Sequence, residues 1–386
     1  MLDYGLTEEQ SAIRDLARTI ADNELRPVAA EYDRTGEFPW PVVKKMAEVD
    51  LFRTFIPEEY EGIAGGTPTM NLVLVAEELS KACGGIALAL AGTALGTMPI
   101  LIGASDEQKR RFLPDIAAGK RLAAFALTEP DAGSDAAGIR CTAMKDGDHY
   151  VLNGTKQWIT NGGEAEIYTV LALTNPAKGP RGASMFIVEK DTPGFTFGKK
   201  EDKMGIRASA TRELHFDDCR VPAANLIGRE GTGFITAMRT FDASRPGVGA
   251  QALGIAQGAL DKAVEYSRER HQFGKPISSF QGLQFMLADM ATRVEASRAL
   301  CYAAARAIDA GEKDVSKVSA MAKVFASDTA MSVTTDAVQI FGGYGYMTDY
   351  PVEMMMRDAK ITQIYEGTNE IQRDEISRHL IKESVG

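Results

Sequence analysis

The hydrophobic pattern of this chain changes twice, near residue 120 and near residue 232, and no other feature constrains the fold as strongly. Before the first change and after the second, apolar residues recur at helical spacing, as in Ile13, Leu16 and Ile20. Between the changes, short β-branched and aromatic runs are separated by turn dipeptides. The pattern predicts an α+β fold with an N-terminal helical domain (1–120), a middle β-domain (121–232) and a C-terminal helical bundle (233–386).

Local signals predict individual elements. Thr7 and Gln10 form a capping-box pattern at the start of the first helix. Further helices are expected at 42–49, 70–80 and 107–113, punctuated by Pro57, residues 62–66 and Pro99. Strands are expected near Phe125 and at 150–152, 167–173, 184–188, 195–197 and 213–216. Breaks at Pro246-Gly247 and Gly342-Gly343 should separate the later helices.

Charge and cysteine usage exclude several functional classes. The net charge of −10 gives no general attraction to nucleic acid, so a polyanionic ligand must be met by local Lys and Arg. The four cysteines and four histidines are scattered without metal-ligand spacing, so we expect no metal site and no disulfide framework. A reducing compartment is the natural expectation.

Neither a targeting segment nor a membrane span is expected. Residues 1–4 lack a basic and an apolar region of the signal-peptide type, which predicts a cytoplasmic protein. Residues 82–105 carry no charge and are long enough to cross a bilayer. Five glycines and Pro99 interrupt them, so a buried helix with its connections is the preferred interpretation.

Two segments in the middle region carry groups suited to a ligand. The first runs from Phe125 to Asp135, where a short strand enters a turn that carries two hydroxyls and a glycine. The second contains Trp158 and Thr160, which are two residues apart and should share one strand face. Taken singly, each also fits ordinary turn chemistry or a core aromatic residue.

Two further segments lie in the C-terminal third. Arg268, Arg270 and Lys275 follow a helix end, where they suit either a solvated terminus or a bound pyrophosphate. The paired glycines Gly342-Gly343 permit close backbone approach. Downstream, Glu366 precedes a glycine where a helical pattern resumes, and alone it would be a surface or capping carboxylate.

Together these segments resemble the acyl-CoA dehydrogenase family over nearly the whole chain. Five motifs occur in family order: Thr-Glu-Pro-x-Ala-Gly-Ser-Asp, Gly-x-Lys-x-Trp-Ile-Thr-Asn, Arg-x-Gln-Phe-Gly-Lys, Gln-Ile-Phe-Gly-Gly-x-Gly and Arg-Asp-Ala-Lys-Ile-x-x-Ile-Tyr-Glu-Gly-Thr. The resemblance implies a middle domain of β-barrel-like or sandwich form and a C-terminal four-helix bundle. It also implies FAD as the cofactor, an electron-transferring flavoprotein as electron acceptor and a homotetramer.

The resemblance assigns residues to the cofactor. The flavin ring would be lined by Phe125, Leu127, Thr128 and Ser134, with Trp158 against it and Thr160 near its N5 edge. The pyrophosphate and adenosine of a neighbouring subunit's FAD would be held by Arg270, Gln272, Phe273, Gln281, Gln339, Gly342 and Gly343. Thr368 and Glu370 would close over the cofactor.

The resemblance also assigns residues to an acyl-CoA substrate. Glu366 would remove the α-proton while FAD takes the β-hydride, giving a trans-2-enoyl-CoA. Ser134, Asp242, Arg245, Tyr365 and Gly367 would lie on the substrate side. For Asp242, a helix N-cap is an equally good interpretation.

A carboxylate with a reference pKa of about 4.3 is too weak to remove this proton unaided. Desolvation of Glu366 and hydrogen bonds to the thioester carbonyl would close the gap. In the family those bonds come from the backbone N–H of the catalytic Glu and from a ribityl hydroxyl of FAD.

The acyl group is expected to be uncharged. Ile86 stands where glutaryl-CoA members carry a basic residue, and the small residues Ala87, Ala89, Ala91, Gly92 and Ala94 leave room for a short or medium chain or an alicyclic ring. The alternatives are an acyl-CoA oxidase, a glutaryl-CoA-type dehydrogenase and a non-catalytic flavin- or acyl-CoA-binding scaffold. The scaffold would be expected to lack Glu366 or Trp158, and both are present.

Overall fold

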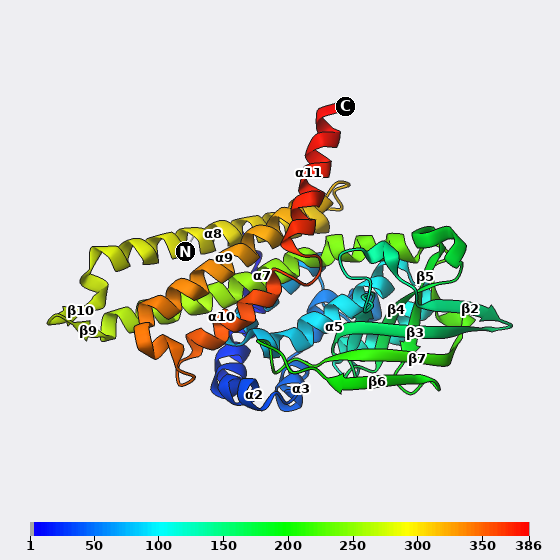
Figure 1. Ribbon diagram of the computed structural model, residues 1–386, viewed down its shortest axis with the longest axis horizontal. Coiled ribbons are helices and arrows are strands. Elements are labelled where there is room, and N and C mark those ends of the chain that lie inside the picture. Colours follow the sequence, from blue (N-terminus) through cyan, green and yellow to red (C-terminus); the bar gives the residue numbers. More distant parts are fainter. Residues whose placement is uncertain (1–3, 386) are drawn as a thin grey trace.

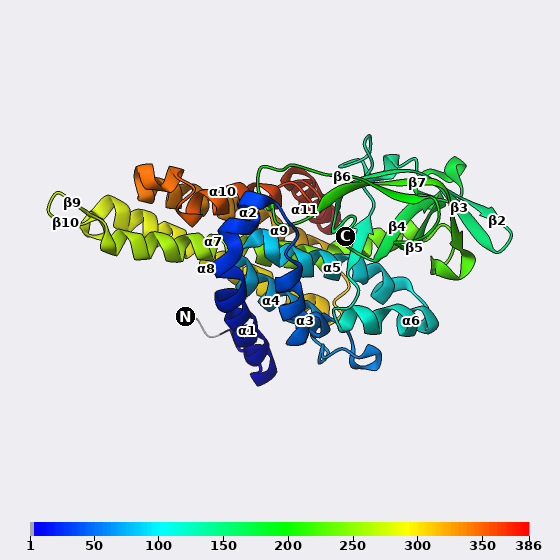
Figure 2. The ribbon, with the colours of Figure 1, turned by 90° about the horizontal axis from the view of Figure 1, so that it is seen from below.

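The computed structural model describes residues 4–385. Residues 1–3, which belong to the segment predicted to lack a targeting signal, and Gly386 lie outside the described residues. A helical part, a β part and a second helical part follow one another along the chain, as predicted (Figure 1). Most of the N-terminal helices lie midway along the molecule, and the last of them, residues 106–117, lies alongside the sheet (Figure 2). The α+β class is confirmed.

The N-terminal part is built from short helices around one long apolar helix. Its helices are α1 (Glu8–Ile20), α2 (Ala29–Thr35), α3 (Trp40–Glu48), α4 (Pro68–Ala82), α5 (Gly84–Gly103) and α6 (Asp106–Ala117). The capping box is confirmed, because the N–H of Gln10 donates to Oγ1 of Thr7 (3.1 Å) and the N–H of Thr7 donates to Oε1 of Gln10 (3.2 Å).

The predicted break at Pro99 is wrong, because Pro99 lies inside α5. Among residues 4–385, α5 is the helix whose length and apolar composition would suit a membrane span, yet 78% of its apolar window is buried inside the protein. A Cβ at Gly96 would lie 2.4 Å from the backbone nitrogen of Ala124, so glycine lets α5 lie directly on the first strand. Packing of this helix into the core outweighs its local helix breakers.

The middle part forms one mainly antiparallel sheet in the described chain. Its strands are β1 (Ala123–Ala126), β2 (Thr142–Asp146), β3 (His149–Thr160), β4 (Ile167–Leu173), β5 (Ala183–Glu189), β6 (Phe195–Lys200), β7 (Thr211–Pro222) and β8 (Leu226–Ile227). The strand order is β6-β7-β3-β2-β4-β5-β8, with β1 parallel to β4. Every predicted strand falls within one of these elements.

The C-terminal part is a bundle of long helices with a small hairpin at one end. Its elements are α7 (Gly233–Glu269), β9 (His271–Gln272), β10 (Lys275–Pro276), α8 (Gln281–Asp309), α9 (Ser316–Phe341), α10 (Pro351–Thr362) and α11 (Asn369–Val385). The predicted break at Gly342-Gly343 is confirmed, because α9 ends at Phe341 and Gly342 has φ 62°. Figure 1 shows α11 projecting away from the other helices.

The predicted break at Pro246-Gly247 is wrong, and the structure gives the reason. Pro246 lies inside α7 and has no N–H for the carbonyl of Asp242, four residues earlier. The hydroxyl of Ser319 on α9 donates to that carbonyl instead (2.7 Å). The helix continues because a neighbouring helix supplies the missing hydrogen bond.

Two apolar clusters form the core, and α4 and α7 contribute to both. The two helices approach closely because glycines of α7 face α4. A Cβ at Gly254 would lie 2.3 Å from the carbonyl oxygen of Glu77, and one at Gly258 would lie 2.4 Å from that of Lys81. α4 and α7 therefore join the N-terminal helices to the bundle.

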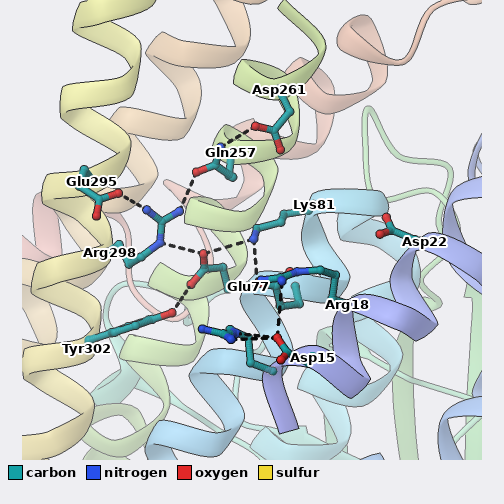
Figure 3. A network of polar contacts seen from close by, with 12 residues as sticks. Asp15, Arg18, Asp22, Glu77, Lys81, Gln257, Asp261, Glu295, Arg298 and Tyr302 are labelled. Atoms are coloured by element: carbon teal, nitrogen blue, oxygen red, sulfur yellow. Dashed lines mark hydrogen bonds and ion pairs between the residues drawn. The ribbon is translucent and has the colours of Figure 1, made fainter. Parts of the chain in front are cut away.

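A buried ionic network crosses the same contact (Figure 3). Glu77 is only 2% exposed, and its carboxylate accepts from Nε of Arg298 (2.9 Å) and from the hydroxyl of Tyr302 (2.8 Å). Arg298 also donates to Oε1 of Gln257 (2.7 Å). The network ties α4, α7 and α8 together, and each buried charge has its partners.

Candidate active site

Glu366 lies in a short connection between α10 and α11, in a backbone conformation that is unusual for its residue type. Its φ is 53°, in the left-handed region, and that of Gly367 is 93°. The side chain of Gln372 holds this turn, since its Nε2 donates to the carbonyls of Glu366 (3.1 Å) and Gly367 (3.0 Å). A Cβ at Gly367 would lie 2.6 Å from the same Nε2, which explains the glycine.

The carboxylate of Glu366 is half-buried and faces α7. The hydroxyl of Ser244 donates to its Oε2. Desolvation raises the pKa of Glu366, and the Ser244 hydrogen bond and the positive charges of Arg245 and Lys323 oppose that shift. The net effect is a carboxylate more basic than one in water, which is the property a proton acceptor needs.

Two residues that were predicted to lie on the substrate side, Asp242 and Arg245, are on α7, and the charge of Arg245 acts on Glu366. Arg245 is buried, its Nη1 lies 3.1 Å from Oδ1 of Asp242, and its Nε has no partner in the described chain. The N-cap interpretation of Asp242 is wrong, since this residue lies inside α7 and its Oδ2 accepts from the hydroxyl of Ser316 (2.7 Å). Burial raises the pKa of Asp242.

Tyr365 is held through its ring hydroxyl. The hydroxyl donates to Oε1 of Gln251 on α7, and Nε2 of Gln251 donates to the carbonyl of Gly84 at the start of α5 (3.0 Å). The Glu366 connection is thus tied to both α7 and α5.

An aromatic contact links the Glu366 region to the β-domain. The rings of Phe125 on β1 and Phe241 on α7 meet edge to face, with centroids 5.7 Å apart. Phe241 precedes Ser244 and Arg245 by three and four residues, so the three side chains lie on neighbouring parts of one helix face. The stretch of α7 that contacts Glu366 through Ser244 therefore also contacts β1 through Phe241.

Trp158 is presented to the outside by an irregularity in β3. The pairing of β3 with β7 shifts register between Lys156 and Ile159, and Trp158 has φ 61° with 57% of its surface exposed. Ile159 is buried and Thr160 is half-buried. A large aromatic residue held exposed in a strained conformation fits a binding surface better than a core.

A buried ion pair fixes the turn after β1. Lys156 is fully buried, and its Nζ donates to the carbonyl of Leu127 (2.8 Å) and to Oε1 of Glu129 (2.7 Å). Thr128 is half-buried, and Ser134 is exposed in the following turn. Lys156 thereby joins the segment that follows Phe125 to β3, the strand that carries Trp158.

The residues predicted to bind pyrophosphate and adenosine lie at the other end of the bundle. Arg270 follows α7, and its guanidinium lies 5.4 Å from the ring centroid of Tyr344, in the 3₁₀ turn Gly342–Tyr346. The hairpin β9–β10 presents Phe273, which is 92% exposed with φ 53°. Gln272, Gln281 and Gln339 are exposed, and a Cβ on Gly342 or Gly343 would meet no atom within 4 Å.

The predicted cofactor residues therefore form two separate groups within one chain. The stretch of α7 from Phe241 to Glu269 is about 42 Å long at 1.5 Å per residue. Figure 1 shows the hairpin β9–β10 and the strands of the sheet at opposite ends of the long axis. Thr368 and Glu370 lie next to Glu366, with Thr368 half-buried and Glu370 exposed.

Sequence reasoning missed Ser244, Lys323 and Gln372, all of which contact the Glu366 turn. Ser244 lies between two predicted substrate-side residues, Asp242 and Arg245, and that position is the available signal. Lys323 is a single cation in the apolar run Ala320-Met-Ala-Lys-Val-Phe-Ala, which is the available signal. Gln372 carries no signal of its own.

Models of three protein domains match almost the entire chain. They are the N-terminal domain (residues 7–120), the middle domain (124–219) and the C-terminal domain (231–381) of acyl-CoA dehydrogenase.

Full-length relatives carry related names. Acryloyl-CoA reductase (NADH) of Anaerotignum propionicum is 52% identical over 99% of this chain and 96% of its own. Cyclohexane-1-carbonyl-CoA dehydrogenase of Geobacter metallireducens is 46% identical over 99% of this chain and 100% of its own.

Solved structures agree over the same length. Butyryl-CoA dehydrogenase of Megasphaera elsdenii has a TM-score of 0.96 and 47% identity over 98% of this chain and all of its own. A chain from a study of the electron transferring flavoprotein of Acidaminococcus fermentans has a TM-score of 0.95 and 50% identity, over 98% of this chain and 99% of its own. An acyl-CoA dehydrogenase of Bacillus anthracis complexed with FAD has a TM-score of 0.92 and 34% identity, over 100% of this chain and 69% of its own. The chain belongs to the acyl-CoA dehydrogenase family of oxidoreductases.

Proposed function

We propose that this protein catalyses the FAD-dependent α,β-dehydrogenation of an acyl-CoA to a trans-2-enoyl-CoA, with Glu366 as the α-proton base. The observation that carries the proposal is the Glu366 turn. It holds a half-buried carboxylate of raised pKa against Ser244 and Arg245, beside the aromatic contact that leads to β1.

The backbone around Glu366 supports a second role. In the described part of the chain the N–H of Glu366 has no protein acceptor. This donor is free for the carbonyl oxygen of a thioester, where negative charge develops as the α-proton leaves. Arg245, whose Nε has no partner among residues 4–385, adds positive charge near Glu366.

The residues present fit FAD. The exposed indole of Trp158 and the side chains of Phe125 and Thr160 suit a flat ring system, and Arg270 beside the open glycines Gly342 and Gly343 suits a pyrophosphate. When bound, FAD supplies a hydride acceptor at N5 of its ring, which no amino-acid side chain can replace. Trp158 and the turn after β1 would position and cover the ring.

Because the two groups of cofactor residues are far apart in one chain, we propose that they come from two copies. The Arg270 and Phe273 end of one subunit would complete the site formed by Trp158 and Thr128 of another. A homotetramer is the assembly we propose, and an electron-transferring flavoprotein is the proposed electron acceptor, supported by the relative from the flavoprotein study. We retain the cytoplasmic location as a prediction, to be tested by cell fractionation.

The acyl group is proposed to be short or medium in length, or a compact ring. Ile86 is apolar and fully buried, so this position offers no cation to a distal carboxylate. Gly92, however, faces Thr160 and Asn161 rather than open space, since a Cβ there would lie 2.8 Å from Cγ2 of Thr160. The names of relatives that act on butyryl-CoA and cyclohexane-1-carbonyl-CoA support the same range.

Anaerobic titration of the purified flavoprotein tests the proposed function. Butyryl-, hexanoyl- and cyclohexanecarboxyl-CoA should each be tried, and bleaching of the oxidised flavin by at least one of them is expected, with the enoyl-CoA as product. Absence of bleaching with all three would contradict the proposal. Rapid reoxidation of the bleached enzyme by O₂ would indicate an oxidase, and bleaching by glutaryl-CoA alone would indicate the glutaryl-CoA type.

A further inference from the structure

Lys323 on α9 is fully buried, directly behind the Glu366 turn. Its Nζ donates to the carbonyl of Gly367 (2.8 Å) and to Oδ1 of Asn369 (2.9 Å). These two residues lie just after Glu366, and Asn369 begins α11. Both acceptors are neutral, although burying an ammonium group is costly unless the charge is compensated.

The partners of Lys323 are themselves fixed. Nδ2 of Asn369 donates to the hydroxyl of Ser327 (2.9 Å) and to Oδ1 of Asp328 (2.7 Å), both on α9. Lys323 and Asn369 thus clamp the end of the turn onto α9, while Gln372 holds its carbonyls from α11.

The clamp has a physical task, because the turn is strained. The left-handed region is unfavourable for a non-glycine residue, and such conformations persist only where surrounding contacts impose them. The φ of 53° at Glu366 decides where its carboxylate points. The Lys323 clamp and the two hydrogen bonds from Gln372 are contacts of this kind.

Lys323 and Glu366 also influence the pKa values of each other. Burial lowers the pKa of Lys323 to about 7, the negative charge of Glu366 opposes that shift, and the ammonium in turn lowers the pKa of Glu366. The other charged groups around Lys323 are Arg245 on α7, Asp328 on its own helix and Glu370 on α11.

We propose that Lys323 is a positioning residue for the proton-transfer step, which clamps Gly367 and Asn369 so that the Glu366 carboxylate stays at Ser244. The inference rests on the proposed function. It assigns Lys323 no contact with substrate or FAD, and it explains why a lysine occupies an otherwise apolar stretch of α9.

The variants Lys323→Met and Lys323→Gln test the clamp. Lys323→Met keeps an unbranched apolar side chain that reaches to Cε but removes the donor and the charge, whereas Lys323→Gln keeps a donor for the carbonyl of Gly367. Lys317→Met is the matched control, because Lys317 lies on the same helix, is partly exposed and pairs with Glu383 at the surface. Each variant is assayed as the holoenzyme for flavin content, substrate-dependent bleaching and its pH profile, and amide hydrogen exchange.

For Lys323→Met we expect normal flavin content, a KM within about twofold of wild type and a bleaching rate lowered about 10- to 100-fold, the loss that misplacement of a reacting group produces. The acid limb of its rate profile should move to higher pH, because the loss of a positive charge raises the pKa of Glu366. Lys323→Gln should recover part of the rate and keep the shifted limb. The amide hydrogens of residues 363–372 should exchange faster in Lys323→Met than in the wild type. In Lys317→Met they should exchange at the wild-type rate.

Wild-type rate and pH profile in Lys323→Met would overturn the inference. Loss of FAD or of the folded assembly in both Lys323 variants would also overturn it, since the lysine would then be a general structural residue. Failure of the proposed function itself is separate: wild-type enzyme would not bleach, and hydrogen exchange at 363–372 would still decide whether Lys323 holds the turn.

Discussion

Removal of the Ser244 hydroxyl should change the pH at which the enzyme gains activity. Its hydrogen bond to Glu366 stabilises the ionised carboxylate. A hydrogen bond to a charged group contributes about 1.5–3 kcal/mol, and 1.36 kcal/mol corresponds to one pKa unit. The variant Ser244→Ala should therefore raise the pKa of Glu366 by about one to two units.

The sign of the effect follows from the role of the base. Glu366 must be ionised to accept a proton, so the rate rises as pH increases through its pKa, and a higher pKa moves that acid limb to higher pH. Stopped-flow bleaching of the flavin by substrate, measured from pH 5 to pH 9, gives the limb directly. At pH values above the new pKa, the variant should regain a rate close to that of wild type.

Thr240→Val provides the control. Thr240 lies one turn earlier on α7, is buried, and its hydroxyl donates to the carbonyl of Thr236 (2.9 Å) rather than to Glu366. The acid limb of the pH profile of Thr240→Val should therefore coincide with that of the wild type. An acid limb that is unmoved or lowered in Ser244→Ala would refute the assigned role of this hydrogen bond.

Three further predictions concern stability. Arg298→Met removes the guanidinium 2.9 Å from the buried Glu77 carboxylate and leaves it the more distant ammonium of Lys81 (3.7 Å). It should cost about 3 kcal/mol of unfolding free energy in chemical denaturation, at the lower end of the range for a broken buried ion pair, whereas Tyr302→Phe should cost about 1 kcal/mol. Equal losses would contradict this account. Ser319→Ala leaves the carbonyl of Asp242 unsatisfied beside Pro246 and should cost about 1–3 kcal/mol, and no loss would show that the carbonyl is otherwise satisfied. Burial raises the pKa of Asp358 to about 7, so the native state binds its proton more tightly than the unfolded chain and loses stability as pH rises from about 4 to 7. Asp358→Asn should remove that loss, which is up to about 4 kcal/mol above pH 7, and equal pH dependence of the two proteins would contradict the prediction.

The sequence predicted the elements whose signals are local. Short β-branched and aromatic runs located the strands, the Thr7 and Gln10 capping box located α1, and Gly342-Gly343 located the end of α9. These signals act within a few residues, so no tertiary information is needed to interpret them.

Both errors at proline have a tertiary cause. Pro246 looks like a helix end until Ser319, on a helix far along the chain, supplies the missing donor to the Asp242 carbonyl. Pro99 is tolerated in a helix that is buried and closely packed on β1. Helix propensity depends on the local sequence, so it does not include a hydrogen bond or a packing contact made by a distant segment.

The candidate site divides in the same way. Glu366, Trp158 and Arg270 could be proposed because they lie in motifs. Ser244 and Lys323 could not, because their importance comes from contacts across 122 and 44 residues of sequence. The spacing of motifs along the chain likewise gave no indication that β9, next to Arg270, and β3, which carries Trp158, lie far apart along the long axis of one subunit (Figure 1).

The variant Glu366→Gln tests the central claim most directly. Glutamine keeps the size of the side chain and can still accept the Ser244 hydrogen bond, but it cannot accept the α-proton. With full flavin content and acyl-CoA binding retained, anaerobic mixing with a substrate of the wild-type enzyme should give almost no bleaching. Bleaching at the wild-type rate would show that Glu366 is not the base.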